Sequence, residues 1–188
     1  ATTATATTAI GYKAGHLIVA GDYNTYIGYE SGSANTTSSY STSNSNTAIG
    51  YMAGRRIGTG GGGDNNVYVG KEAGSSSTTG ASNVAIGSGA GKTITTGSAN
   101  IVLGTGAGDA MTTSSNCILI GTSAGTAIDS ADADGTIAIG ENACQALTES
   151  QFNTAIGFQA AQLITTGARN TVLGYGALDA ADGAETDN

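Results

Sequence analysis

The sequence predicts an all-β protein, a parallel β-solenoid of about ten turns built from a 17-residue repeat. One observation is a recurring phrase, clearest at residues 83–91 as Asn-Val-Ala-Ile-Gly-Ser-Gly-Ala-Gly. Another is the spacing of its first glycine, the anchor glycine, which recurs at intervals of 17, 22, 20, 17, 17, 17, 19, 17 and 17 residues. The anchor glycines are Gly11, Gly28, Gly50, Gly70, Gly87, Gly104, Gly121, Gly140, Gly157 and Gly174.

Composition agrees with a stack of thin turns. The 188 residues include 31 Gly and no Pro, and only 11% of them are charged. Large aliphatic residues are too few for one globular core, yet the charge is too low for a disordered chain. Each turn of a solenoid needs only a thin apolar layer, which stacking makes continuous. At a spacing of about 4.8 Å between turns, ten turns give a rod roughly 48 Å long.

Within each repeat we expect two short strands joined by tight glycine turns, because runs such as Val-Ala-Ile are β-branched and too short for a helix. The residue directly before the anchor is always aliphatic, so we expect this column to be the core. A small residue three positions after the anchor and an aliphatic residue seven after it are expected to point inward as well. The pre-anchor column is Ile10, Ile27, Ile49, Val69, Ile86, Leu103, Ile120, Ile139, Ile156 and Leu173.

Two further columns carry expectations about corners and assembly. An asparagine four positions before most anchors, as at Asn83 and Asn100, suits a turn and predicts a ladder of side-chain amides at one corner. The position two before the anchor is also largely apolar, and alternation along a strand places it opposite the expected core column. We therefore expect it to line the axis of a homotrimer, with six candidate interface residues: Ala85, Val102, Leu119, Ala138, Ala155 and Val172.

Charge and hydropathy exclude two classes of partner. The net charge of −8 disfavours binding to a nucleic-acid backbone. The longest apolar runs are about five residues, far below the roughly 20 that a membrane-spanning helix needs. We expect no nucleic acid, no membrane insertion, and a location outside the cell or on a virion surface. The chain is read as one repeat domain, residues 1–188, cut from a longer fibrous protein.

The repeats resemble two known families. Residues 153–160, Asn-Thr-Ala-Ile-Gly-Phe-Gln-Ala, and their relatives at 46–53 and 83–87 look like repeats of phage tail-fibre shafts. They are also similar to the head repeats of trimeric autotransporter adhesins, in which a Val-Ala-Ile-Gly strand is followed by Ala at a fixed offset. The resemblance covers essentially the whole chain and implies a left-handed parallel β-roll assembled as a homotrimer. The repeat here is longer than the usual adhesin repeat, because it carries an additional Ile-Thr-Thr-Gly segment.

Several motifs suggest small-molecule or metal chemistry. Residues 87–93 approximate a phosphate-binding loop but have three residues, not four, between the glycines, so we expect no nucleotide and no cofactor. The acidic insertion holds Asp129, Asp132 and Asp134, which we interpret as a solvated loop, with a surface Ca²⁺ site as the alternative. The single histidine, His16, leaves no Ser/His/Asp triad to assemble, so we expect no enzyme.

The two cysteines, Cys117 and Cys144, occupy different positions in their repeats. We expect buried hydrophobic thiols, with a disulfide between them as the alternative. The pair Arg55 and Arg56 is expected to form a solvated corner.

Three insertions, at residues 36–45, 58–65 and 129–135, lengthen the repeat. Surface loops tolerate extra residues and carry recognition, so we expect them to project and to contact a host-cell receptor or polysaccharide. The candidate contact residues are Tyr40, Asn44, Asp64 and Asn65.

The leading functional hypothesis is a structural fibre segment, a trimeric shaft or adhesive head. Two alternatives stay open. One is a self-assembling surface-layer or matrix filament. The other is an ice-binding solenoid, suggested by a partial ladder of threonine pairs at 36–37, 78–79, 95–96, 112–113 and 165–166.

Overall fold

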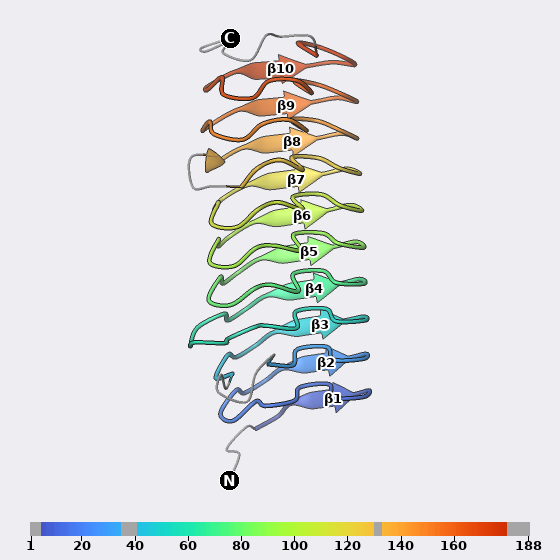
Figure 1. Ribbon diagram of the computed structural model, residues 1–188, viewed down its shortest axis with the longest axis vertical. Helices are drawn as coiled ribbons and strands as arrows, with labels where there is room; N and C mark the ends of the chain where they lie inside the picture. The colour runs from blue at the N-terminus through green and yellow to red at the C-terminus, as the bar shows by residue number, and fades with distance from the viewer. Residues whose placement is uncertain (1–4, 35–40, 130–132, 180–188) are drawn as a thin grey trace.

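The computed structural model describes residues 5–34, 41–129 and 133–179, and it is a rod of stacked turns (Figure 1). Ten three-residue strands form one parallel sheet whose spatial order follows the chain, with about nine turns between the first and last strand. The parallel β-solenoid is therefore confirmed. The strands are β1 (Thr8–Ile10), β2 (Thr25–Ile27), β3 (Thr47–Ile49), β4 (Val67–Val69), β5 (Val84–Ile86), β6 (Ile101–Leu103), β7 (Ile118–Ile120), β8 (Ile137–Ile139), β9 (Thr154–Ile156) and β10 (Thr171–Leu173).

The register between turns is constant along the whole rod. Each pre-anchor residue pairs with the next, for example Ile86 with Leu103 and Leu103 with Ile120. The pairs that span the three insertions, β2 with β3, β3 with β4 and β7 with β8, keep the same register. The extra residues are therefore accommodated without shifting the stack, as expected for surface loops.

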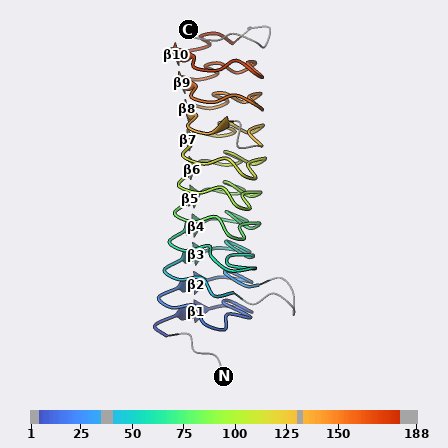
Figure 2. The ribbon, with the colours of Figure 1, turned by 90° about the vertical axis from the view of Figure 1, so that its left-hand side faces the viewer.

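Within the described residues each turn holds one strand rather than the two that the sequence suggested. The remainder of a turn consists of tight corners, several of which place a non-glycine residue in the left-handed region, as at Glu72 (φ 56°) and Asn116 (φ 60°). Such corners reverse the chain within one or two residues and leave no room for a second extended segment. Figure 2 shows the result edge-on, with the strands aligned along one side of the rod.

The anchor glycines are required by two independent constraints. Their φ angles lie between 127° and 140°, a region that other residues rarely enter. A Cβ atom on Gly104 would also lie 2.5 Å from the carbonyl oxygen of Gly121 in the next turn. The Gly104 N–H donates to the carbonyl of Ile86 in the previous turn at 2.9 Å. Glycine therefore lets successive backbones approach closely enough to hydrogen-bond.

The structure corrects the assignment of the two strand faces. The middle residue of each strand points inward, and from Tyr26 to Ala155 this column is at most 1% exposed. The pre-anchor residue points outward, with Ile86 42% and Ile49 37% exposed. The prediction that the column from Ile10 to Leu173 is the core was wrong. The small residues three after the anchor and the aliphatic residues seven after it are buried, as predicted, for example Ala90 and Ile94.

Side-chain volumes inside the rod compensate each other within a turn. Most turns combine a small or medium residue in the middle of the strand with a large one seven after the anchor, as in Ala85 with Ile94. In the β4 turn the sizes are exchanged: Tyr68 fills the interior, and its hydroxyl bonds to that of Ser77 at 3.0 Å. A Cβ on Gly74 would lie 2.4 Å from the Tyr68 ring. Close packing thus fixes the residue sizes turn by turn.

The predicted asparagine ladder is present and buried. The Asn83 side-chain oxygen accepts a hydrogen bond from the Asn100 backbone N–H at 3.0 Å, and its amide donates to the carbonyl of Gly97 at 2.9 Å. Asn66 and Asn153 make the same two bonds to the backbone of the turn that follows, whereas Asn46 only accepts the Asn66 backbone N–H and its buried amide nitrogen has no partner among the described residues. Because buried backbone groups must be paired, the ladder stabilises the corner where the chain enters each strand.

We predict that Gly104→Ala destabilises the fold by more than about 4 kcal/mol, because it adds a backbone clash to an unfavourable φ. Gly106→Ala is the matched control from the same turn. Gly106 has φ 64°, and the nearest atom to a Cβ there is 3.9 Å away, so we expect a loss of only about 1 kcal/mol. Urea unfolding followed by circular dichroism measures both. Equal losses would contradict the account of the anchor position.

Candidate functional site

The outer sheet face is a largely apolar surface that runs along the described rod. It consists of the first and last residue of every strand, and these side chains are half-buried or exposed. The first column runs from Thr8 to Thr171 and contains only Thr, Val and Ile, while the last runs from Ile10 to Leu173 and contains only Ile, Val and Leu. Parallel sheets are normally covered on both faces. Within residues 5–34, 41–129 and 133–179, the side chains of both columns stay half-buried or exposed, so no described segment covers this face.

The six residues predicted to line a trimer axis lie inside the rod. Ala85, Val102, Leu119 and Ala138 are fully buried, and Ala155 and Val172 are 1% and 5% exposed. They cannot contact another copy while the chain stays folded. The prediction was wrong because the two strand faces are exchanged. The aliphatic residues directly before the anchors lie outside the rod, and the middle residue of each strand, which varies more in size, lies in the narrow interior. The surface available to another copy is the outer sheet face.

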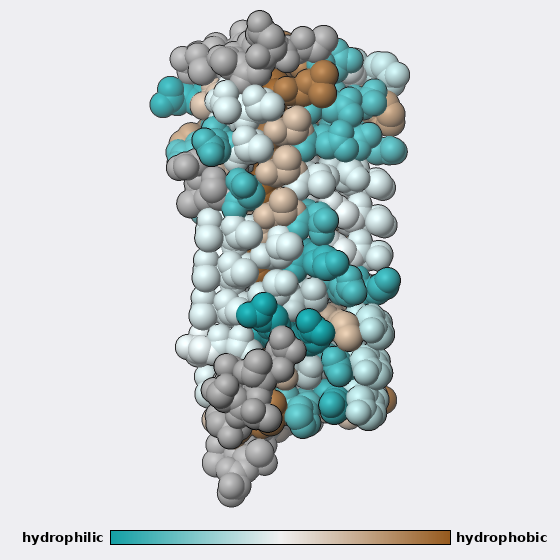
Figure 3. All heavy atoms as spheres, in the orientation of Figure 1, coloured by the Kyte–Doolittle hydropathy of each residue, from teal (hydrophilic) through white to brown (hydrophobic). Residues whose placement is uncertain are grey.

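The side opposite the sheet has a different character. It faces the viewer in Figure 3, where small and polar residues cover most of the surface and one narrow apolar band runs along the upper half. Alanines 110, 127 and 146 lie half-buried six residues after their anchors. This side therefore lacks a broad apolar area like that of the outer sheet face.

The receptor candidates Asn44 and Asp64 have a structural role. Asp64 Oδ1 accepts the Asn44 backbone N–H at 2.7 Å, and Asn44 Oδ1 accepts that of Asp22 at 2.9 Å. These bonds form a second ladder, at the position eleven residues after the anchor in a 17-residue turn. It was not predicted from the sequence because Asp, Asn and Ser all serve as the acceptor, so no single residue type recurs at this position. Asn65 occupies a left-handed corner, and Tyr40 lies outside the described residues. A receptor contact by these residues stays a prediction.

The acidic insertion is only partly described. Asp134 Oδ1 accepts the Ser115 backbone N–H at 2.7 Å, so its carboxylate continues the second ladder. The Asp129 carbonyl accepts a bond from the Thr112 hydroxyl, and Asp132 lies outside the described residues. Over residues 5–34, 41–129 and 133–179, no group of three or more His, Cys, Asp or Glu side chains could hold a metal ion. The Ca²⁺ alternative therefore stays untested.

The threonine pairs divide into two roles. The hydroxyls of Thr78 and Thr95 donate to carbonyls of the following turn, at 3.0 and 2.9 Å, and so stabilise the stack. The second threonine, as at Thr79 and Thr96, is exposed. A single column of exposed threonines on a bend differs from the flat two-dimensional array that the ice-binding hypothesis requires.

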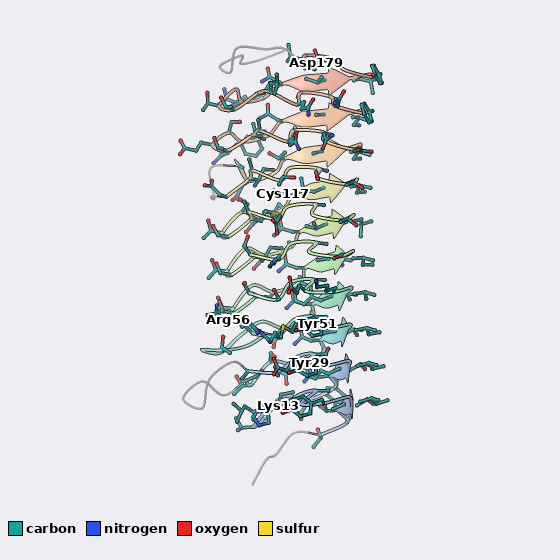
Figure 4. The ribbon with its side chains drawn as sticks, turned by 45° about the vertical axis from the view of Figure 1, so that its right-hand side comes forward. Lys13, Tyr29, Tyr51, Arg56, Cys117 and Asp179 are labelled. Atoms are coloured by element: carbon teal, nitrogen blue, oxygen red, sulfur yellow. The ribbon has the colours of Figure 1, made fainter. Side chains whose placement is uncertain are left out.

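Aromatic side chains form short stacks at the corner just after the anchor. Tyr12, Tyr29 and Tyr51 stack in order, with ring centroids 5.1 and 5.3 Å apart, and Figure 4 labels the last two. Phe158 and Tyr175 form a second stack with centroids 5.3 Å apart. Equivalent positions in successive turns lie one strand spacing apart, which brings the rings into contact. The sequence contained this signal, a Tyr or Phe directly after five anchors.

Two ion pairs join neighbouring positions of adjacent turns, and their side chains are half-buried. Lys92 Nζ lies 2.9 Å from Glu72 Oε2, and this bond lowers the pKa of the Glu72 carboxyl. Arg55 Nη1 lies 4.0 Å from Glu30 Oε2. These pairs join adjacent turns at the surface, where each contributes little to stability. Arg55 and Arg56 are half-buried, and the Arg55 Nε is buried without a hydrogen-bond partner among the described residues, so the corner is less solvated than the sequence suggested.

Cys117 and Cys144 are free and buried, which confirms the expectation of hydrophobic thiols. Burial raises the pKa of Cys117 to about 11 and that of Cys144 to about 12. Thiolate is the reactive form, so neither side chain is prepared for nucleophilic chemistry. Burial likewise raises the pKa of Tyr26 and Tyr68 to about 12.

Comparison of the chain with protein families, with curated protein sequences and with solved structures gave no significant match. In the described part of the chain, no helix is long and apolar enough to cross a membrane.

We predict that both thiols are unreactive towards a thiol reagent such as dithionitrobenzoate at pH 8 in the native protein and react only after unfolding. The raised pKa values also predict alkaline destabilisation. The unfolded thiols deprotonate above pH 9.0, the ordinary value, whereas the folded ones hold their protons to about 11 and 12. Stability is therefore complete below pH 9 and falls by about 1.4 kcal/mol per pH unit for each thiol above it.

Urea unfolding at pH 8, 9, 10 and 11 measures this slope. The control is Cys144→Ala, since Ala161 occupies the same position in the following turn. The variant should lose less stability than the wild type between pH 9 and 11. Native thiols that react at pH 8 would contradict the buried placement.

Proposed function

We propose that this chain is a non-catalytic structural rod that assembles as a homotrimer through its outer sheet face and forms part of a fibre attaching to cell surfaces. The observation that carries the proposal is the uncovered apolar face of the ten-stranded parallel sheet. Its two columns hold only Thr, Val, Ile and Leu over the full length of the rod. A surface of this kind in water marks an interface.

The shape of the face supports assembly with further copies of the same chain. The apolar columns repeat at the spacing of the strands, so a second rod aligned in parallel presents the same spacing along the whole contact. The face is narrow because it is only two columns of side chains wide. A narrow face allows several rods to pack around a shared axis. Symmetric assembly of identical chains is also the commonest form of oligomer. The number three comes from the resemblance to adhesin heads and tail-fibre shafts.

The charge pattern favours a role in attachment rather than in nucleic-acid or membrane binding. Ten of the fourteen acidic residues, but only one of the six basic residues, lie after residue 94. This half would repel a phosphate backbone. A rigid rod with solvent-facing loops is suited to presenting contacts at a distance from its point of attachment.

We predict opposite outcomes for two neighbouring substitutions in β7. Leu119 is fully buried, so Leu119→Asp places an unpaired charge in the interior and should unfold the chain. Ile120 belongs to the outer sheet face, so Ile120→Asp should keep the fold and abolish assembly, because three carboxylates would be brought together without partners. Circular dichroism reports the fold, and sedimentation velocity reports assembly.

Thr122→Asp is a suitable control, since Thr122 is exposed just beyond the anchor and outside the sheet face. It should fold and assemble like the wild type. An Ile120→Asp variant that still assembles would refute the interface. A folded Leu119→Asp variant would refute the inward placement of the middle column.

A further inference from the structure

A shallow pocket lies on a corner of the rod, away from the outer sheet face. Two successive turns form it, through residues 149–152 of one turn and residues 166, 168 and 169 of the next. Its volume is about 390 Å³, within the range of small-molecule sites. Glu149, Gln151, Phe152 and Arg169 supply its larger side chains. The corresponding stretches at 79–82 and 96–99, Thr-Gly-Ala-Ser and Thr-Gly-Ser-Ala, contain only small residues.

Phe152 is one of two aromatic residues in its column, the position five before the anchor, and the other is Tyr23. Phe152 lies in the left-handed region with φ 61° and is 59% exposed. Apart from Tyr23 and Arg169, the same position in other turns holds small residues or asparagine, namely Ala6, Ser45, Asn65, Ser82, Ala99, Asn116 and Gly135. A bulky aromatic residue is unfavourable in that backbone conformation, and its exposure means that the core does not require it.

The neighbouring turn leaves room for the ring. A Cβ atom on Gly135 would lie 3.0 Å from Phe152 Cδ1, so the ring lies against bare backbone. The Phe152 N–H donates to the Asp134 carbonyl at 3.2 Å, which fixes the backbone that carries the ring. The ring is thus held at the rim of the pocket by backbone contacts.

The chemistry of the lining matches a neutral sugar. Sugar hydroxyls both donate and accept hydrogen bonds, and the lining contains the carboxylate Glu149, an acceptor, the guanidinium Arg169, a group with five N–H donors, and the amide Gln151, which both donates and accepts. The apolar ring of Phe152 can cover the C–H face of a pyranose. Because the lining contains charges of both signs, it favours neither a simple anion nor a simple cation.

We propose that this pocket binds a single sugar unit of a neutral polysaccharide. The assignment rests on the proposed attachment role and names the ligand class for it. A peptide strand would need an unpaired sheet edge for its backbone, and the strands here are paired along the rod. Because the pocket is open at the surface, neighbouring sugar units could continue along the rod.

The test is saturation-transfer difference NMR on the full chain with three probes: methyl α-D-glucopyranoside, methyl β-D-galactopyranoside and N-acetylglucosamine. We expect at least one probe to receive saturation from the protein with millimolar affinity, as suits one sugar unit in a shallow pocket. Transfer to none of the three would overturn the proposal.

Phe152→Ser is the decisive variant, because serine already occupies this position at Ser45 and Ser82. It should fold like the wild type and weaken binding of the same probe by about tenfold or more, a difference of 1.4 kcal/mol per factor of ten. Tyr23→Ser is the matched control: Tyr23 has the same place in its turn, φ 58° and 68% exposure, but does not line the pocket. It should leave binding unchanged.

Unchanged binding in Phe152→Ser, or equal losses in both variants, would overturn the assignment. Should Phe152→Ser fail to fold, Glu149→Ala replaces it, with a loss of at least about threefold expected and no loss overturning the proposal. The pocket lies within one chain, so its failure is separable from that of the proposed function. A trimer that binds none of the sugars refutes only the pocket, whereas a monomer that binds one refutes only the trimer.

Discussion

The close approach of successive anchor glycines is the constraint on which the rest of the structure depends. From Gly28 to Gly174 the anchor N–H donates to the previous turn, and from Gly11 to Gly157 the next anchor's carbonyl occupies the space where a Cβ would lie. This contact sets the same register for all ten strands, whether or not an insertion intervenes. In-line stacking then brings like residues together in columns. The asparagine ladder, the acceptor ladder at Asp22, Asn44 and Asp64, and the aromatic stacks all follow from that alignment.

A narrow interior is the second consequence, and it explains which residues lie outside. Three inward columns and the asparagines fill each turn, and the large strand residue Tyr68 is accompanied by the small Ser77 seven after the anchor. The regular β-branched residues on either side of each middle residue are left on the outer sheet face. The same chain therefore has a closed core and an uncovered apolar face. Assembly of several copies is the simplest way to remove that face from water.

Much of this architecture could be predicted from the sequence, because spacing identifies a repeat without any knowledge of side-chain direction. The solenoid, the in-line register, the asparagine ladder and the buried cysteines were all predicted. Which strand face points inward was predicted wrongly. Ile86 and Ala85 are both apolar, and the column that is always aliphatic was expected to be the buried one. The exchange of sizes between Tyr68 and Ser77 is a signal that could have identified the inward column. The pocket at Phe152 depends on side chains from adjacent turns, which spacing alone does not reveal.

Light scattering of the unaltered chain at micromolar concentration tests the central claim, that the outer sheet face is buried between copies, most directly. The chain has a mass of 18.2 kDa, so the account predicts a particle of about three times that mass with a β-rich circular dichroism spectrum. A folded particle with the mass of one chain would contradict it, since the apolar face would then remain in water without a partner.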